Sequence, residues 1–512
     1  LLTTATLNYV YISPYFDNIE VYKVETINYP VDVKYLSVDY DIMRNSPDKF
    51  YGEIINAEGN QPGNIIIFRP GVQEVLSTVK YLETMFPRLP VYSIYSNMTQ
   101  DEQNRVLENP DTQKVIVGTN IIESSITIPN VRIVIDDLLE KTLQVSKSGN
   151  NKLALIYISK SSADQRKGRT GRTMPGRCYR LCTRDFFEKL PEYNSIEIDR
   201  VSIDKQILQL LNSGLEPQSL LKIDDIKYQT TINNLMRNNL ISLESGKIET
   251  TDLGIFVSKL TLSVRSSILL SKIYIEFLTN PSDEFLQFLL LSGLAVCCMI
   301  DNFTDGYFNI PKKLESQTES DYNDYVDDIR FKYHEKLRGR TDIHTFVNIY
   351  WDIIRKMTSS KNYNIVFAEP TSQYLIEYST TNYMNYKKLK EVFNCIQINE
   401  RIVISGMPDS YKINLHERYA TEDIQLNMAE IIVEYFVKVY EDNKILLYQS
   451  KQSQTSQQMQ TTKPIYRMTD GNTVMLSKYN FNNIDGISFY AGNIMEILTG
   501  RGVVNMASVL AN

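Results

Sequence analysis

The segment from Gln165 to Arg172 holds the side chains best suited to chemistry on a charged ligand. It reads Gln-Arg-Lys-Gly-Arg-Thr-Gly-Arg, with three arginines separated by glycines. A guanidinium matches phosphate oxygens, and an arginine directed at a γ-phosphate neutralises the charge that develops in phosphoryl transfer. A glutamine is suited to orienting the attacking water. We predict that Gln165, Arg169 and Arg172 face a terminal phosphate and that none of the arginines belongs to a core. A basic surface loop is the alternative.

A second polar cluster lies N-terminal to the arginines. The segment Gly118 to Ile128 follows the β-branched run Lys114 to Val117 and contains several hydroxyls and an amide. Such groups at a strand end can donate to phosphate oxygens of a nucleic-acid backbone without reading its sequence. Thr119, Asn120 and Ser124 are therefore candidate backbone contacts, and a helix cap is the alternative interpretation.

The elements that position these residues are short strands. Residues 1 to 184 alternate helical patterns with the runs Ile65–Phe68, Val115–Val117 and Ile133–Ile135. Polar loops follow each run, which is typical of a parallel α/β layer. Ligands bind at the carboxyl ends of such strands. The two polar clusters are expected in those loops.

Size and composition indicate a multi-domain globular protein. The chain has 512 residues, 43% hydrophobic and 22% charged, with a formal net charge of −7. This length exceeds one ordinary core, and an acidic chain must confine any nucleic-acid site to a local channel. The apolar stretch from Phe285 to Ile300 is shorter than the ~20 residues that span a bilayer. It is predicted to be a buried helix.

Cysteines and histidines are sparse. The five cysteines form no Cys-x-x-Cys pair and the three histidines lie apart from them, which favours neither zinc nor a disulfide framework and indicates a reducing, intracellular compartment. We predict Cys178 and Cys182 to be core residues and His344 to be a packed or capping residue. The start of the chain lacks Met and a signal pattern and is interpreted as a cut end.

After residue 184 the sequence no longer alternates β-branched runs with helical patterns, and helical patterns predominate. Helical patterns at Ile203–Leu211 and Gln229–Leu240 precede a hairpin with Ser245 and Gly246 at its turn, which suggests a winged-helix module. Residues 259 to 400 read as mainly helical and the rest as strand-rich. The Gln-, Ser- and Thr-rich segment Gln449–Thr462 is expected to be a loop between strands.

The motifs in this order resemble those of the DEAH-type RNA helicases of superfamily two. Val115–Ile128 is similar to motif V, Ser159–Arg172 to motif VI and Ile65–Gly71 to motif IV. Thr4, Ala5 and Thr6 resemble motif III, which couples the two lobes, and Tyr29–Val33 resembles the opening of the second RecA-like lobe. Motif VI is especially similar to that of the poxvirus NTP-hydrolysing RNA helicase, with Lys167 where cellular members usually carry Ala.

The resemblance continues beyond the motor lobe. Thr251–Gly254 is similar to the end of the family's winged helix, and Asp342–Tyr350 and Asn385–Leu389 resemble segments of its helical ratchet domain. Asp470–Leu476 resembles a strand of its OB-fold. The implied fold is multi-domain: motif III and a linker (1–20), an α/β RecA-like lobe (21–184), a winged helix (185–258), a helical ratchet-like domain (259–400) and an OB-fold-like β domain (401–512).

The resemblance implies a 3′→5′ RNA helicase that hydrolyses ATP or another NTP with Mg²⁺ and moves single-stranded RNA through a channel. Protein activators are further expected partners, and a membrane is not. Ser96 and Asn97 join the motif V residues as RNA contacts. Leu107 stands where the family has a phenylalanine that stacks on the nucleobase, and Pro129 stands where it has an aspartate.

Two family motifs do not occur in the sequence. There is no Gly-x-x-x-x-Gly-Lys-Ser/Thr and no Asp-Glu-x-His, which in the family lie on the first RecA-like lobe. We therefore expect a fragment that lacks that lobe, with ATP and Mg²⁺ bound mainly by the missing part, and expect these 512 residues alone to be inactive.

Two other functions are open at this stage. One is a non-catalytic RNA-binding scaffold derived from a helicase, although the Gln and Arg residues of motif VI would then have no use. The other is a DNA helicase, because contacts with a nucleic-acid backbone can distinguish RNA from DNA only through the 2′-hydroxyl. The poxvirus-like motif VI suggests a viral protein, which would be cytoplasmic or virion-associated.

Overall fold

The computed structural model describes residues 8–16, 18, 20–22, 29–36, 47–58, 61–96, 98, 100–107, 113–124, 126–145, 151–244, 246–302, 307, 317–329, 337, 339, 341–359, 372–405, 421–440, 444–448, 465–468, 473–476, 488–496 and 502–509. Thr4, Ala5, Thr6, Asn97 and the Gln-, Ser- and Thr-rich segment lie outside them. The chain divides into two compact units, Leu1–Gln144 with Leu153–Arg200, and Val145–Lys152 with Val201–Asn512. The first unit extends past the boundary expected at residue 184.

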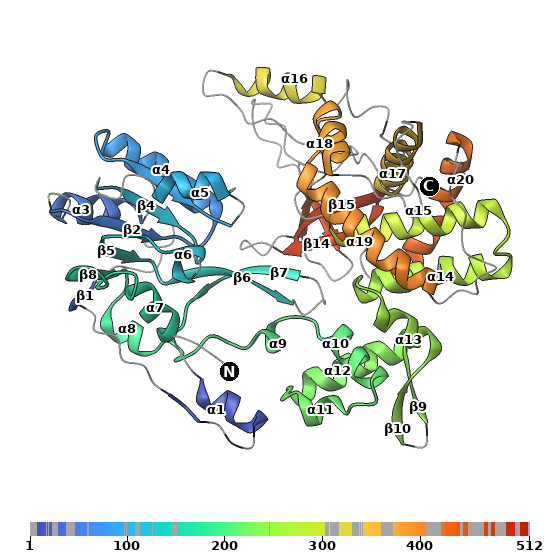
Figure 1. Cartoon of the computed structure of the whole chain (residues 1–512), viewed down its shortest axis with the longest axis horizontal. Helices are drawn as coiled ribbons and strands as arrows, with labels where there is room; N and C mark the ends of the chain where they lie inside the picture. Colours follow the sequence, from blue (N-terminus) through green and yellow to red (C-terminus); the bar gives the residue numbers. More distant parts are fainter. Residues whose placement is uncertain are drawn as a thin grey trace. The chain divides into compact units, whose positions relative to one another are not determined.

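A six-stranded parallel sheet forms the centre of the first unit (Figure 1). Its order is β1-β8-β5-β2-β4-β3, where the strands are β1 (Val31–Tyr35), β2 (Asn64–Phe68), β3 (Val91–Ile94), β4 (Val115–Gly118), β5 (Val131–Asp136) and β8 (Gly176–Arg180). The interior strands β2 and β4 are buried along their whole length because helices cover both faces. The α/β lobe predicted from the β-branched runs is confirmed.

The two faces of the sheet have separate cores. Ile65 and Ile67 of β2 pack with residues of α3 (Asp48–Glu58) and α4 (Val72–Met85), whereas Ile66 and Phe68 pack with Val106 of α5 (Gln100–Leu107) and Ile122 of α6 (Ile121–Ser124). Successive residues of a strand point to opposite faces, so one apolar run supplies both cores.

The first unit also contains α1 (Tyr9–Ile12), a 3-10 turn (Ser13–Tyr15), α7 (Lys160–Lys167), α8 (Arg184–Glu188) and α9 (Glu197–Arg200). It contains most of the paired strands β6 (Leu139–Val145) and β7 (Asn151–Tyr157), whose ends at 145 and 151–152 belong to the second unit.

The second unit begins with short helices and a hairpin: α10 (Asp204–Asn212), α11 (Pro217–Leu220), α12 (Asp225–Arg237), β9 (Ile241–Glu244), β10 (Lys247–Thr250) and α13 (Asp252–Lys259). Asp224 and Thr251 accept from the first-turn amides of α12 and α13, which fixes where each helix starts. The antiparallel hairpin matches the expected one, and Gly246 has a φ of 81° at its turn.

Longer helices follow: α14 (Val264–Thr279), α15 (Glu284–Asp301), α16 (Glu319–Ile329), α17 (Asp342–Ser359), α18 (Ser372–Thr381), α19 (Tyr386–Ser405) and α20 (Glu422–Val439). All of these except α16 contribute buried residues to one large apolar core. Among the described residues, α15 is the one single helix long and apolar enough to cross a membrane, and the bent pair α13 and α14 passes the same test together. Of the α15 window, 72% is buried inside the protein. The prediction of a buried helix at 285–300 is confirmed.

The sequence-based boundary at residue 400 disagrees with the structure. It falls inside α19, and α20 is a helix where a strand-rich domain was expected to begin. Met428, Ile432 and Phe436 of α20 are buried in the core of the preceding helices. Strands follow only afterwards: β11 (Lys444–Tyr448), β12 (Ile465–Met468), β13 (Thr473–Leu476), β14 (Ser488–Glu496) and β15 (Gly502–Val509).

Candidate functional site

Four loops of the first unit meet at one edge of its sheet. Ser96 follows β3, Thr119 follows β4, Arg69 follows β2, and Asp137 follows β5. In the strand register Gly118 is opposite both Ile94 and Phe68, and Phe68 is opposite Asp136, so the four strands end together. Because all are parallel, these ends are carboxyl ends, where ligands bind in such folds. The expected location is confirmed for the polar cluster that follows β4. The arginine segment does not follow a strand: it comes after α7, leads into β8 and packs against the starts of β1 and β5.

The motif V segment turns sharply after β4. The amide of Thr119 donates to the carbonyl of Ile94 at 3.2 Å, and the buried side chain of Ile122 anchors α6 to the sheet. Thr119 is half-buried and Asn120 is exposed. A Cβ on Gly118 would lie 2.7 Å from the carbonyl oxygen of Ile94, so only glycine fits there. The structure thus brings Ser96, Thr119 and Asn120 to the same edge, with Ser124 at the end of α6.

The motif VI arginines follow a short capped helix. The Ser159 hydroxyl accepts from the amide of Ser162, and α7 ends at Lys167, directly before Gly168. Gly171 has a φ of 79°, and its carbonyl accepts from the amide of Tyr29 at 2.8 Å. A side chain there would meet Val31 at 2.6 Å. The glycines therefore shape a loop after the helix and bring it against the start of β1.

Arg166 corrects the prediction that no arginine of this array belongs to a core. Its side chain is 1% exposed, with Nε 3.1 Å from Glu123 and Nη1 2.9 Å from Asp136. The guanidinium also lies over the ring of Phe68, 4.8 Å from the centroid. Regular spacing along the sequence did not reveal that this arginine points inward, because α7 turns its side chains in different directions.

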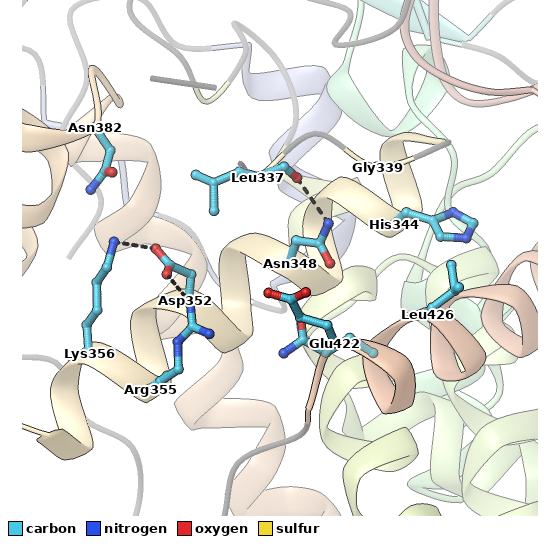
Figure 2. Close-up of a pocket in the computed structure, with 11 residues that line it drawn as sticks. Leu337, Gly339, His344, Asn348, Asp352, Arg355, Lys356, Asn382, Glu422 and Leu426 are labelled. Atoms are coloured by element: carbon cyan, nitrogen blue, oxygen red, sulfur yellow. Dashed lines mark hydrogen bonds and ion pairs between the residues drawn. The ribbon is translucent and has the colours of Figure 1, made fainter. Parts of the chain in front are cut away.

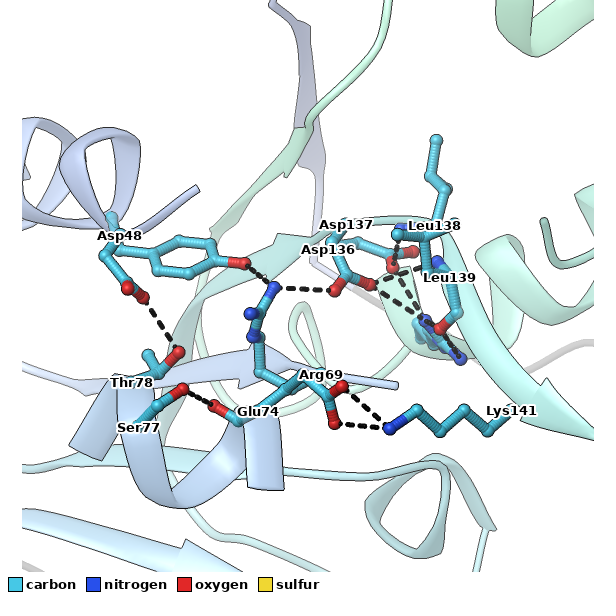
Figure 3. A network of polar contacts seen from close by, with 12 residues as sticks. Asp48, Arg69, Glu74, Ser77, Thr78, Asp136, Asp137, Leu138, Leu139 and Lys141 are labelled. Atoms are coloured by element: carbon cyan, nitrogen blue, oxygen red, sulfur yellow. Dashed lines mark hydrogen bonds and ion pairs between the residues drawn. The ribbon is translucent and has the colours of Figure 1, made fainter. Parts of the chain in front are cut away.

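Arg166 belongs to a buried polar network with a second arginine, Arg69. Figure 3 shows Arg69 of this network directed at Asp137, with Asp136 beside them. Arg69 donates to the Tyr51 hydroxyl at 2.9 Å and pairs with Asp137 at 3.2 Å. Burial raises the pKa of Asp137 to about 6, although the charges of Arg69 and Arg166 oppose the shift. Two arginines and two aspartates thus connect the ends of β2 and β5 to α7, and their charges are satisfied within the lobe.

Arg169 and Arg172 have different surroundings. Arg169 is half-buried and donates to the carbonyls of Ile126, at 3.3 Å, and Glu123, while its Nε is buried without a partner. Burial and the charge of Arg172 lower the pKa of Arg169. Arg172 is exposed, and its Nε donates to the carbonyl of Gly168 at 3.0 Å. Within the described residues, neither guanidinium has a carboxylate within 4.0 Å, so no ion pair there neutralises either charge.

The other predicted nucleotide residues lie nearby in sequence or fold. Gln165 is on α7 directly before Arg166 and is half-buried. Leu107 is the last residue of α5 and packs against the core that contains Phe68 and Ile122. The structure thus gives Leu107 a packing role, and its contact with a nucleobase stays a prediction.

Sequence reasoning missed four residues of this site: Arg69, Glu123, Asp136 and Asp137. A signal was present for the aspartates. Two adjacent carboxylates directly after a buried β-branched strand need cationic partners, because an isolated buried charge is too costly. Arg69, directly after the strand Asn64–Phe68, was the obvious partner.

A separate polar pocket of about 440 Å³ lies in the second unit (Figure 2). One wall is α17 with His344, Asn348 and Asp352, and α20 contributes Glu422. Its cations are already paired, since Arg355 and Lys356 lie 3.0 and 2.7 Å from Asp352. Burial opposes ionisation of Asp352, but bonds from Lys356 and Tyr378 outweigh it and lower the pKa. The pocket therefore presents compensated charges and amide groups.

The expected packing roles of a histidine and two cysteines are confirmed. His344 is 3% exposed, with Nδ1 2.8 Å from the Thr341 hydroxyl and Nε2 3.3 Å from Glu430. Cys178 and Cys182 are buried, and burial raises the pKa of each thiol to about 12. Within the described part of the chain, no group of three or more His, Cys, Asp or Glu residues could hold a metal ion.

Known proteins resemble this chain in both sequence and fold. Residues 47–174 match the helicase conserved C-terminal domain. The ATP-dependent RNA helicase HrpA of Borreliella burgdorferi is 27% identical over 416 residues, which cover 80% of this chain and 46% of that protein. The ATP-dependent RNA helicase TDRD9 of Mus musculus is 40% identical over 169 residues, 32% of this chain and 12% of that protein.

A solved structure extends the likeness to the fold of most of the chain. The crystal structure of the Escherichia coli DExH-box NTPase HrpB superposes with a TM-score of 0.60 at 14% identity, covering 94% of this chain and 46% of that one. This chain spans less than half the length of these relatives. Residues 47–174 thus match the helicase conserved C-terminal domain, the chain is similar in sequence to the ATP-dependent RNA helicases HrpA and TDRD9, and its fold is similar to that of HrpB.

Proposed function

We propose that this chain is the C-terminal part of an ATP-dependent RNA helicase that moves 3′→5′ along single-stranded RNA. The observation that carries the proposal is the state of Arg169 and Arg172. Both lie in the loop after α7, and neither is paired with a carboxylate within the described part of its lobe. Their neighbour Arg166, by contrast, is fully neutralised by Glu123 and Asp136. Two uncompensated guanidinium groups beside buried ion pairs suit a triphosphate supplied by a partner lobe.

In the proposed mechanism, two RecA-like lobes close on ATP. Arg169 and Arg172 then reach the γ-phosphate, and Gln165 orients the attacking water. The phosphate-binding loop and the catalytic glutamate would lie on a first lobe upstream. Mg²⁺, which screens the phosphate charge, fits that lobe better than this one. Here the two strand-end carboxylates, Asp136 and Asp137, are already bound by arginines.

RNA would bind at the carboxyl ends of strands β3 and β4. Ser96, Thr119 and Asn120 lie at the adjacent ends of β3 and β4, with Ser124 at the end of α6. Asn97 is a further proposed contact that lies outside the described residues. Hydroxyl and amide groups here can hold phosphates without reading the sequence. Thr4, Ala5 and Thr6 would couple the lobes as in motif III.

The second unit would hold the domains that follow the motor lobe in the helicases that this chain resembles. Two helices with a hairpin and α13 have the composition of a winged helix, and α14–α20 would be the ratchet-like domain, which extends the predicted 259–400 to include α20. The strands β11–β15 would be the OB-fold-like domain. A viral, cytoplasmic origin rests on the motif VI resemblance alone.

The test uses the helicase encoded by the complete reading frame, with both lobes. We expect ATP hydrolysis that rises with single-stranded RNA, and unwinding of duplexes with a 3′ RNA overhang but not with a 5′ overhang. RNA binding without ATP hydrolysis would support the scaffold alternative instead. If duplexes with a 3′ DNA overhang are unwound as well as those with a 3′ RNA overhang, the result would support a DNA helicase. These 512 residues alone should show no RNA-stimulated ATP hydrolysis.

A further inference from the structure

One residue of motif V, Glu123, holds two arginines of motif VI. Its carboxylate accepts from Nε of Arg166 at 3.1 Å, and its backbone carbonyl accepts from Nη2 of Arg169. The second carbonyl that holds Arg169, that of Ile126, lies three residues further along the same segment. The position of Arg169 therefore depends on where α6 and the residues after it lie.

Arg166 fixes that position. Its Nη1 is anchored to Asp136 at the end of β5, and Nη1 and Nη2 each lie 3.3 Å from the carbonyl of Leu139. The arginine side chain is 1% exposed and that of Glu123 is 13% exposed. Breaking a buried pair of this kind leaves an uncompensated charge, so the pair is a strong tether between α6 and the sheet.

The same short helix carries the proposed RNA contacts. Thr119 and Asn120 immediately precede α6, and Ser124 ends it. The carbonyls of Thr119 and Asn120 accept from the amides of Ile122 and Glu123 at 3.2 and 2.9 Å. A displacement of the Thr119–Asn120 backbone by a bound phosphate is therefore transmitted directly to Glu123.

We propose that Glu123 is a positioning residue that couples RNA binding at Thr119 and Asn120 to the placement of Arg169, through its ion pair with Arg166. The inference rests on the proposed function and adds a role for a residue that touches neither ligand. Without the tether, α6 can still bind RNA, but its movement no longer places the Arg169 guanidinium.

The test compares Glu123→Gln with the wild-type two-lobe helicase. The amide keeps the shape of the side chain but removes its charge. We expect the RNA-stimulated kcat for ATP hydrolysis to fall by about tenfold or more, the size of a typical coupling between sites. The stimulated rate should fall more than the basal rate, so that the ratio of stimulated to basal rates drops, while the RNA concentration that gives half-maximal stimulation should stay within about twofold. A purely structural residue would lower the basal and stimulated rates together.

Glu58→Gln is the matched control. Glu58 is also a buried carboxylate of this lobe, with a side chain 7% exposed, and it binds Arg132, Arg177 and Tyr179 of β5 and β8. It should leave the ratio of stimulated to basal rates unchanged. Thermal unfolding checks that each variant folds. If Glu123→Gln does not fold, Glu123→Asp serves, because it keeps the charge and shortens the reach, and its ratio should also fall.

The outcomes separate this inference from the proposed function. A wild-type protein with no RNA-stimulated hydrolysis overturns both. A wild-type protein that is stimulated, with a Glu123→Gln variant that keeps the same ratio, overturns the positioning role alone. Equal loss of basal and stimulated rates in the variant also rejects the coupling.

Discussion

Arg169 donates to the backbone carbonyl of Glu123, and this contact holds the guanidinium without neutralising it. A carboxylate partner would orient the side chain equally well but would cancel much of its charge. Carbonyl oxygens orient it through their dipoles only. The lowered pKa of Arg169, caused by burial and by Arg172, reflects a cation kept in place at some electrostatic cost. The proposed contact with a γ-phosphate requires such an oriented and uncompensated cation.

Replacing Arg172 tests the catalytic assignment. Arg172 is exposed, so Arg172→Ala should leave the folded lobe intact. In the two-lobe helicase we expect ATP turnover to fall by ~10³ or more, as for a lost arginine finger, while RNA binding stays within a few-fold. Steady-state ATP hydrolysis and RNA binding measure the two effects. Arg184→Ala, at an exposed arginine of α8, is the control and should change neither. A mild loss for Arg172→Ala would contradict the assignment.

The parallel sheet could be predicted from the sequence because its strands are buried on both faces. The runs at 65–68, 115–117 and 133–135 became β2, β4 and β5 with bounds shifted by one or two residues. The roles within motif VI could not be separated in the same way. Arg166 and Arg169 have similar sequence neighbours, yet one pairs with buried carboxylates and the other with carbonyls. The difference depends on contacts with β5 and α6, which are distant in the chain.

The misplacement of residues 401–440 has a different cause. Met428, Ile432 and Phe436 recur at helical spacing, which is a signal for an amphipathic helix. Because strand-like segments follow residue 440, the whole region from 401 to 512 was interpreted as strand-rich. A helix that completes the core of earlier helices cannot be assigned to them without knowledge of tertiary contacts.

Arg166 should be essential for stability, in contrast to Arg172. In Arg166→Met, Glu123 and Asp136 remain as buried carboxylates without their cation. We expect the free energy of unfolding of the first unit to fall by about 3–5 kcal/mol. Urea unfolding followed by circular dichroism measures this. Arg172→Met is the matched substitution at an exposed arginine and should change the free energy by less than about 0.5 kcal/mol. Similar values for the two variants would exclude the buried network as a source of stability.

The raised pKa of Asp137 predicts a specific pH dependence. Its pKa is about 6 in the folded protein against 3.8 for the ordinary group, so between these values the folded state binds a proton that the unfolded state has lost. Stability from this group is therefore lost as pH rises from about 4 to about 6. Asp137→Asn does not titrate. The free energy of unfolding of the wild type, minus that of the variant, should fall by a few kcal/mol over this range. A difference independent of pH would mean that Asp137 is ionised throughout.

Asn120 tests the proposed RNA surface. The side chain is exposed at the end of β4, so Asn120→Ala removes an amide without disturbing a core. We expect RNA affinity to fall by about three- to tenfold, as for the loss of one hydrogen bond to a charged phosphate. The loss should be the same for RNAs of different sequence, because backbone contacts carry no sequence information. Fluorescence anisotropy with labelled oligonucleotides measures it. Asn56→Ala, at an exposed asparagine of α3, should bind normally.

The place of α20 in the helical core can be tested through the single tryptophan of the chain. Trp351 is 1% exposed, donates to the Ser292 hydroxyl at 2.8 Å and belongs to the same core as Met428. Met428 is fully buried, so Met428→Ala should lower the free energy of unfolding by about 2–5 kcal/mol through the cavity it creates. Tryptophan fluorescence reports that unfolding. Leu426→Ala is the control on the same helix, because Leu426 is 52% exposed and its loss should cost less than about 0.5 kcal/mol. If both variants unfold like the wild type, α20 does not contribute to this core, and the boundary near residue 400 regains support.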